Sequence, residues 1–346
     1  MKQIVILIFL FWCVAVPTSA LEIEAPPVPE SGRQWMPENR ESFGEGLLTL
    51  LAKSISNLLP ELKNASRFAV RIFCIVLLTS ILQSVSDSMR SPCDLAGNIG
   101  IVTVLMGNTG AMITLGMNLV REISDYGKLL LPVMTAALAA QGGIATSAAL
   151  YAGTAIFNTV LSSTIVSVLL PGIKLYLVIS VVNSVTGEEL LKRMAEIIKG
   201  TSTWILKFLM MVFTTYLGLS GVVSGATDLA ALKAAKVTIS SVVPVVGGIL
   251  SDASEAVLVS ASIVKNTAGI YGILAVLAVC IGPFLQLFAH YLVLKLTAAV
   301  CAVIGSKTTI SLIDAFSTAM GFLLAVTGGC CIMVLISTVC FMRSVQ

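Results

Sequence analysis

Charged residues are scarce in this sequence. Only 11% of its 346 residues are charged, whereas 57% are hydrophobic and the mean hydropathy is +0.98. A soluble domain usually carries about a quarter charged residues, so the polar surface that a soluble globule needs is missing. Apolar runs recur from Phe68 to the C-terminus. These runs predict an all-α, polytopic integral membrane protein.

Residues that build metal and catalytic sites are also scarce. His290 is the only histidine, and none of the eight cysteines forms a C-x-x-C pair. The sequence contains no G-x-S-x-G, H-E-x-x-H or P-loop motif. The net charge of +3 is scattered between apolar runs, which argues against a nucleic-acid surface. We therefore expect no enzyme, no metal and no cofactor.

The N-terminus has the pattern of an export signal. In residues 1–20, Lys2 precedes an apolar stretch from Ile4 to Val16, and Thr18–Ala20 provides a small-residue cleavage site. The alternative is an uncleaved first membrane helix, although thirteen apolar residues are short for a span. Residues 21–46 contain four prolines and predict an extended, extracytoplasmic linker.

Residues 47–66 predict an amphipathic extracytoplasmic helix. Its apolar face carries Leu47, Leu48, Leu51, Ile55, Leu58 and Leu59, and Pro60 is expected to end its regular part. Such a helix lies on a membrane surface or packs against a partner protein. We interpret Leu47, Leu51, Ile55 and Leu58 as a candidate partner surface.

Residues 67–346 predict a polytopic membrane domain with seven to ten apolar segments. A hydrophilic stretch at 186–203 divides it into halves and carries an amphipathic helix that Gly200 is expected to end. Lys192, Arg193 and Lys199 make this stretch the best cytoplasmic candidate. The halves share a layout: a shift of 112 residues places Pro132 on Pro244 and Pro171 on Pro283. This is either an internal repeat or a chance alignment.

The stretch "SVVPVVGGILSDASE" at 241–255 is apolar but too broken for an ordinary membrane helix. Backbone released from a helix cannot face lipid, so the segment is either a discontinuous helix that lines a pathway or a re-entrant or interfacial turn. Two carboxylates three residues apart favour access to water. The candidate conduit residues are Pro244, Gly247, Gly248, Asp252 and Glu255, with Pro132, Gly142 and Gly143 in the first half.

Three further polar residues, Gln286, His290 and Lys295, fall within one apolar segment. Polar groups in a membrane helix can carry protons, which makes these three candidates for transport. Alternatively, Lys295 extends its amine to an interface and the other two are structural.

Three stretches carry a resemblance to a known family. They are "LPELKNASRFAVRIFCIVLLTSILQSV" (59–85), "ALAAQGGIATSAAL" (137–150) and "KVTISSVVPVVGGILSDASEAVLVSASIVKNTAGIYG" (236–272). In this order they resemble the stage III sporulation protein AE family of endospore-forming bacteria.

The resemblance implies a multi-pass protein of the mother-cell membrane around the forespore. Its expected partners are the other stage III sporulation A membrane proteins and, indirectly, stage II sporulation protein Q, in a channel or secretion-like complex. The resemblance implies no catalytic residues. The alternative function is a stand-alone secondary transporter with Asp252, Glu255 or His290 as coupling groups.

Overall fold

The computed structural model describes residues 26–37, 43–85, 90–140, 144–242 and 247–343, and for 85, 90–91, 218, 220–242, 247–268 and 343 it describes only the backbone. Every element in these ranges is a helix, which confirms the all-α prediction. In chain order they are α2 (Glu30–Arg33), α3 (Phe43–Val85), α4 (Arg90–Ala140), α5 (Ile144–Thr164), a π-helical turn (Ile165–Leu169), α6 (Leu170–Thr186), α7 (Glu189–Val242), α8 (Gly247–Cys301) and α9 (Lys307–Arg343). The predicted signal peptide at 1–20 lies outside the described residues.

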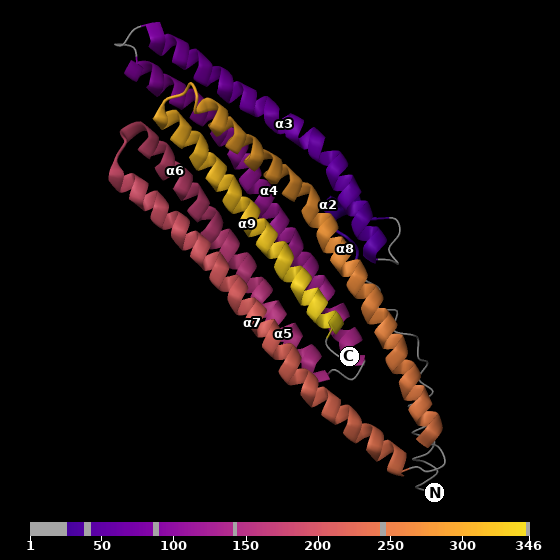
Figure 1. Cartoon of the computed structure of the whole chain (residues 1–346). Coiled ribbons are helices and arrows are strands. Elements are labelled where there is room, and N and C mark those ends of the chain that lie inside the picture. The colour runs from indigo at the N-terminus through magenta and orange to yellow at the C-terminus, as the bar shows by residue number, and fades with distance from the viewer. Residues whose placement is uncertain (1–25, 38–42, 86–89, 141–143, 243–246, 344–346) are drawn as a thin grey trace.

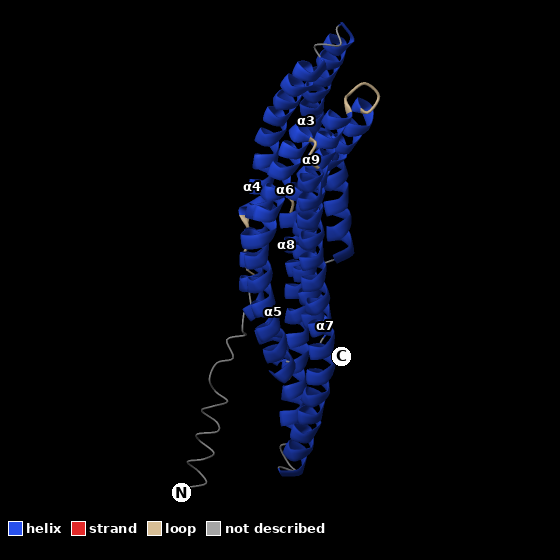
Figure 2. Ribbon diagram, turned by 90° about the vertical axis from the view of Figure 1, so that its left-hand side faces the viewer, coloured by secondary structure: helices blue, strands red, loops and turns tan. Residues whose placement is uncertain are grey.

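The long helices run side by side along one axis (Figures 1 and 2). Gly46 lies against Leu274 and Val76 lies against Gly305, so α3 and α8 run parallel. The chain reverses between α6 and α7 at Gly187, whose φ of 68° is the left-handed conformation that glycine adopts readily. The α6–α7 turn, the α8–α9 turn and the end of α3 lie toward the same end of the molecule (Figure 1).

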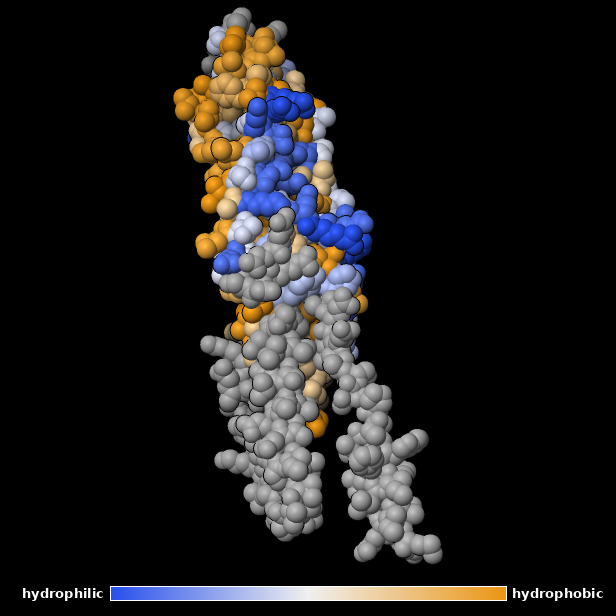
Figure 3. All heavy atoms as spheres, turned by 90° about the vertical axis from the view of Figure 1, so that its right-hand side faces the viewer, coloured by the Kyte–Doolittle hydropathy of each residue, from blue (hydrophilic) through white to orange (hydrophobic). Residues whose placement is uncertain are grey.

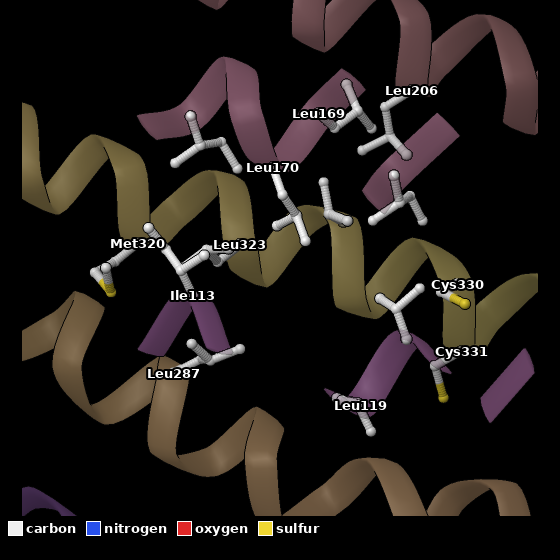
Figure 4. Packing of buried hydrophobic residues seen from close by; sticks show 14 of the residues in the cluster. Ile113, Leu119, Leu169, Leu170, Leu206, Leu287, Met320, Leu323, Cys330 and Cys331 are labelled. Atoms are coloured by element: carbon white, nitrogen blue, oxygen red, sulfur yellow. The ribbon is translucent and has the colours of Figure 1, made fainter. Parts of the chain in front are cut away.

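The core is centred on α8 and α9. In the most apolar eighteen-residue window of each, 56% of the residues are buried, compared with 17% in α3 and 11% in α7. Figure 4 shows why: Met320, Leu323 and Cys330 of α9 lie between α4, α6 and α8, which contribute Ile113, Leu170 and Leu287. α3 and α7 therefore lie at the periphery and present apolar side chains outward.

Six helical units of the described chain are long and apolar enough to cross a membrane, which makes this a multi-pass membrane protein. The count of seven to ten segments stays a prediction, because part of it falls on residues 218–268, whose side chains lie almost entirely outside the description. In the described chain, helices continue through several residues that were expected to end or separate segments. Pro60 lies inside α3, Gly200 inside α7 and Pro283, which falls between two predicted apolar segments, inside α8. A proline removes one helical hydrogen bond, and long apolar helices packed on neighbours tolerate this loss.

Pro171 lies within one continuous helical unit of 43 residues that α5, the π-helical turn and α6 form together. The π-helical turn comes just before the proline, which is near the first position of α6. A π-helical turn accommodates the missing N–H and the bulk of a proline ring without ending the helix.

The proline-rich region folds back onto the bundle, so its expected extended form is wrong for residues 26–37. Trp35 and Val28 are both buried, and α2 packs against α8. Gly282 provides the space for the indole, because a Cβ there would lie 2.7 Å from Trp35 Nε1. Burial of one large aromatic side chain compensates for a segment otherwise rich in proline.

Candidate functional site: the polar and apolar faces of α3

The broken segments predicted to form a conduit fall mostly outside the described residues. Gly142, Gly143 and Pro244 lie in the gaps that separate α4 from α5 and α7 from α8. Gly247 and Gly248 are the first residues of α8, while the side chains of Asp252 and Glu255 lie outside the description. Pro132 is exposed on a continuous helix. A pathway lined by Asp252 and Glu255 therefore stays a prediction.

Gln286 and His290 meet α3 where α8 packs on it. Gln286 Nε2 donates a long hydrogen bond of 3.5 Å to Glu61 Oε1, and His290 Nδ1 donates to the backbone oxygen of Gln286 at 2.9 Å. The His290 ring is buried, with its centroid 6.5 Å from that of Phe68. The two hydrogen bonds use separate atoms of Gln286, so they do not connect His290 to Glu61. This geometry fixes the α3–α8 contact.

Lys295 belongs to a different contact from Gln286 and His290. Its Nζ lies 2.5 Å from Asp314 Oδ1 on α9, and both side chains are about half exposed, at 42% and 50%. An exposed ion pair contributes about 0–1 kcal/mol, so this pair mainly reduces the cost of two charges on apolar helices. The structure therefore does not bring the predicted polar trio into one site.

A polar stripe runs along one side of α3, and its members are Lys53, Asn57, Glu61, Asn64, Arg67 and Arg71. These positions fall on one side of a helix with 3.6 residues per turn. Figure 3 shows a band of hydrophilic residues on the face that α3 presents. Sequence reasoning divided this stripe at Pro60, and only the continuity of α3 through the proline reveals it.

The first part of the stripe holds the N-terminal segment in place. Lys53 Nζ donates to the backbone oxygen of Gln34 and lies 5.9 Å from the centroid of the Trp35 ring, a cation–π contact. Beside it, residues of α2, α3 and α8 surround a hollow of about 570 Å³ that reaches Glu61 and Gln286. The second part of the stripe, which contains the two arginines, faces a separate hollow against α4.

The predicted partner surface also lies on α3, displaced slightly around the helix. Leu51 and Ile55 are exposed, at 47% and 70%, whereas Leu47 and Leu58 are half-buried. Leu48 and Leu59, which belong to the same predicted apolar face but were not among the candidate partner residues, are the more exposed, at 68% and 73%. We define the outer stripe as Leu48, Leu51, Ile55 and Leu59. It lies on the side of α3 opposite the polar stripe.

Metal-binding and enclosed sites are sparse in the described part of the chain. No group of three His, Cys, Asp or Glu side chains there could hold a metal ion, and the seven cysteines in it are free. Thr154 and Asn158 line a cavity between α4, α5, α7 and α9, with about 20 Å³ of space. That is room for about one water molecule. The hollows beside α3 are therefore the larger candidates for binding.

Comparison with known proteins identifies relatives by sequence. The family described as stage III sporulation protein AE matches residues 39–344, a range that includes all the long helices. Stage III sporulation protein AE of Bacillus subtilis (strain 168) is 24% identical over 207 residues, which are 60% of this chain and 52% of that protein. The chain thus matches about half the length of this relative. No solved structure matches the chain.

Proposed function

This chain belongs to the stage III sporulation protein AE family, and we propose that it is a non-enzymatic component of a channel or secretion-like complex between mother cell and forespore. It is a multi-pass membrane protein of sporulation. The family match is the observation that carries the proposal. The exposed outer stripe of α3 supports the further step from a membrane protein to a member of an assembly.

We place the protein in the mother-cell membrane around the forespore, with its mature N-terminus outside the cytoplasm. The α6–α7 turn precedes Lys192, Arg193 and Lys199, which are all exposed. Short stretches rich in lysine and arginine favour the cytoplasmic side. If this turn faces the cytoplasm, α3 begins on the opposite side, because three long helical units precede the turn.

The outer stripe is the proposed contact with partners. Leu48, Ile55 and Leu59 are each more than two-thirds exposed, although the same helix buries another face against α8. Contiguous apolar surface of this kind is typical of protein–protein or membrane contacts. The proposed partners are the other stage III sporulation A membrane proteins and, through them, stage II sporulation protein Q.

Affinity purification from cells in mid-sporulation tests this proposal. The protein is isolated in mild detergent, and co-purifying proteins are quantified by mass spectrometry. We expect near-stoichiometric recovery of other stage III sporulation A proteins, and at least about a tenfold loss for Leu51→Glu/Ile55→Glu, because two buried charges at an interface are strongly unfavourable. Recovery of the wild-type protein alone would contradict the proposal.

A matched variant separates loss of the interface from general damage. Leu190 and Ile197 on α7 are 65% and 66% exposed, so Leu190→Glu/Ile197→Glu introduces the same charges at similar exposure. This variant should retain its partners. Uptake of solutes by vesicles that contain only the wild-type protein, abolished by Asp252→Asn, would instead support a stand-alone transporter.

A further inference from the structure

The second hollow beside α3 lies between α3 and α4 and measures about 690 Å³. From α3 it is lined by Asn64, Arg67, Phe68 and Arg71, and from α4 by Thr103, Val104, Gly107, Asn108 and Ala111. Gly107 leaves the α4 side of the hollow open because it has no side chain, and a Cβ there would have no other atom within 4 Å. We call this hollow the arginine groove.

The groove combines two positive charges with no neutralising acid. Arg67 and Arg71 are one helical turn apart and both are exposed. Within the described part of the chain, neither takes part in an ion pair or hydrogen bond, and no acidic side chain lines the groove. Unpaired arginines on a helix that crosses a membrane are costly, at about 2.5–3.5 kcal/mol at the bilayer centre, so an anionic counterpart is expected.

A third donor comes from α4. The side-chain nitrogen of Asn108 is buried and has no hydrogen-bond partner among the described residues. Leaving a buried donor unpaired is unfavourable, so a ligand that accepts a hydrogen bond from it gains affinity. Arginine and amide donors together match the oxygen atoms of a phosphate group, which accepts several hydrogen bonds at once.

The remaining lining is apolar. Phe68, Val104 and Ala111 provide a wall beside the donors, and both helices are apolar enough to cross a bilayer. A phosphate with attached hydrocarbon chains fits a groove with donors at one side and an apolar wall at the other. A soluble phosphate ester shares the head-group chemistry but makes no use of the wall.

We propose that the arginine groove binds a phosphate group, carried by an anionic phospholipid. Arg67 and Arg71 hold the phosphate oxygens, Asn108 donates a further hydrogen bond, and acyl chains lie along Phe68 and Val104. This site is separate from the outer stripe, because it lies on the opposite side of α3. It would tie the peripheral α3–α4 pair to the lipid around it.

Native mass spectrometry of the full chain in detergent tests the proposal. The protein is titrated with phosphatidylglycerol or with phosphatidylcholine of the same acyl chains, and retained lipid is counted. We expect preferential retention of phosphatidylglycerol, and at least about tenfold weaker binding in Arg67→Gln/Arg71→Gln, since each charge-assisted hydrogen bond contributes roughly a factor of ten or more. Arg67→Lys/Arg71→Lys, which keeps the charge but loses the paired donors, should fall between the two.

Lys63→Gln/Lys174→Gln is the control, because it removes the same charge from two exposed lysines outside the groove. It should bind phosphatidylglycerol as the wild type does. Displacement of the lipid by millimolar glycerol phosphate would show that the phosphate is recognised without the chains, and no displacement would favour the lipid. Equal retention of both lipids, or undiminished binding by Arg67→Gln/Arg71→Gln, would overturn the proposal.

Discussion

Replacing Trp35 with alanine should release the N-terminal segment from the bundle. The indole is 7% exposed and packs against Leu50, Leu274 and Ala278. Truncation of a buried tryptophan usually costs about 3–5 kcal/mol. The buried Nε1–H has no hydrogen-bond partner in the described part of the chain, and removing it returns about 1–3 kcal/mol. We expect the free energy that holds the N-terminal segment on the bundle to fall by about 2 kcal/mol. This is roughly a thirtyfold increase in the equilibrium constant for release of the segment.

Hydrogen exchange measured by mass spectrometry on the full chain in detergent gives this constant directly. Peptides that cover residues 26–37 should exchange roughly thirtyfold faster in Trp35→Ala. Trp35→Phe keeps an aromatic ring and removes the unpaired donor, so its exchange should stay within about fivefold of the wild type. Trp204→Ala removes a 63% exposed tryptophan from α7 and should not affect this segment. Unchanged exchange in Trp35→Ala would refute the reasoning, because it would mean that the indole does not hold the segment.

Three other predictions concern packing and orientation. Gly153→Ala should lower the thermal midpoint in detergent, because a Cβ at this position would overlap the ring of Tyr216, whose hydroxyl donates to the Ala149 oxygen at 2.7 Å. As a control, Gly200→Ala at an exposed position of α7 should stabilise the folded protein by up to about 1 kcal/mol. Asn98→Leu should lower the free energy of unfolding by about 1–3 kcal/mol in denaturation assays, because the buried hydroxyl of Thr309, which donates to Asn98 Oδ1 at 2.8 Å, loses that acceptor. The double variant with Thr309→Val should recover part of this free energy, and strictly additive effects of the two substitutions would contradict the pairing. In a cysteine-free protein produced in non-sporulating cells, where the non-cytoplasmic side faces the medium, Ile55→Cys should react with an impermeant maleimide added outside the cell and Lys192→Cys only after permeabilisation. The reverse pattern would contradict the proposed orientation.

Hydropathy was sufficient to predict the helical membrane class but not where each helix ends. Proline and glycine were interpreted as helix ends. That interpretation is reliable in water, because backbone groups released from the helix can bond to solvent there. In apolar surroundings no such solvent exists, so the helix at Pro283 continues and neighbouring helices compensate. The predicted cytoplasmic side for the stretch after Gly187 fits an extracytoplasmic N-terminus, because three long helical units, an odd number, precede it.

The candidate sites were predictable only where one helix decides them. Leu51 and Ile55 were identified as partner residues from periodicity, and both are exposed. The arginine groove needed Asn108 from another helix beside Arg67 and Arg71, a contact between positions about forty residues apart that no local pattern encodes. Likewise, Lys295 and His290 share a segment of sequence but face different neighbours, because five residues along a helix turn a side chain well away from the first.

The lengths of the helices provide an argument for assembly that is independent of the family match. α4 contains 51 residues and therefore rises about 77 Å, whereas the hydrocarbon core of a bilayer is about 30 Å thick. Even a tilt of about 40° uses only about 40 Å of helix. Wherever the bilayer lies, a large part of α4, and of the longer α7 and α8, must therefore stand outside it. A compact carrier has no need of such extensions, whereas a component that contacts other proteins beyond the membrane does. The outer stripe at Leu48–Leu59 begins near the start of α3, on the side proposed to lie outside the cytoplasm. Leucines exposed on a projecting helix are unfavourable in water unless another protein covers them. Long helices and an uncovered apolar stripe thus both support the proposal that a partner protein docks on α3.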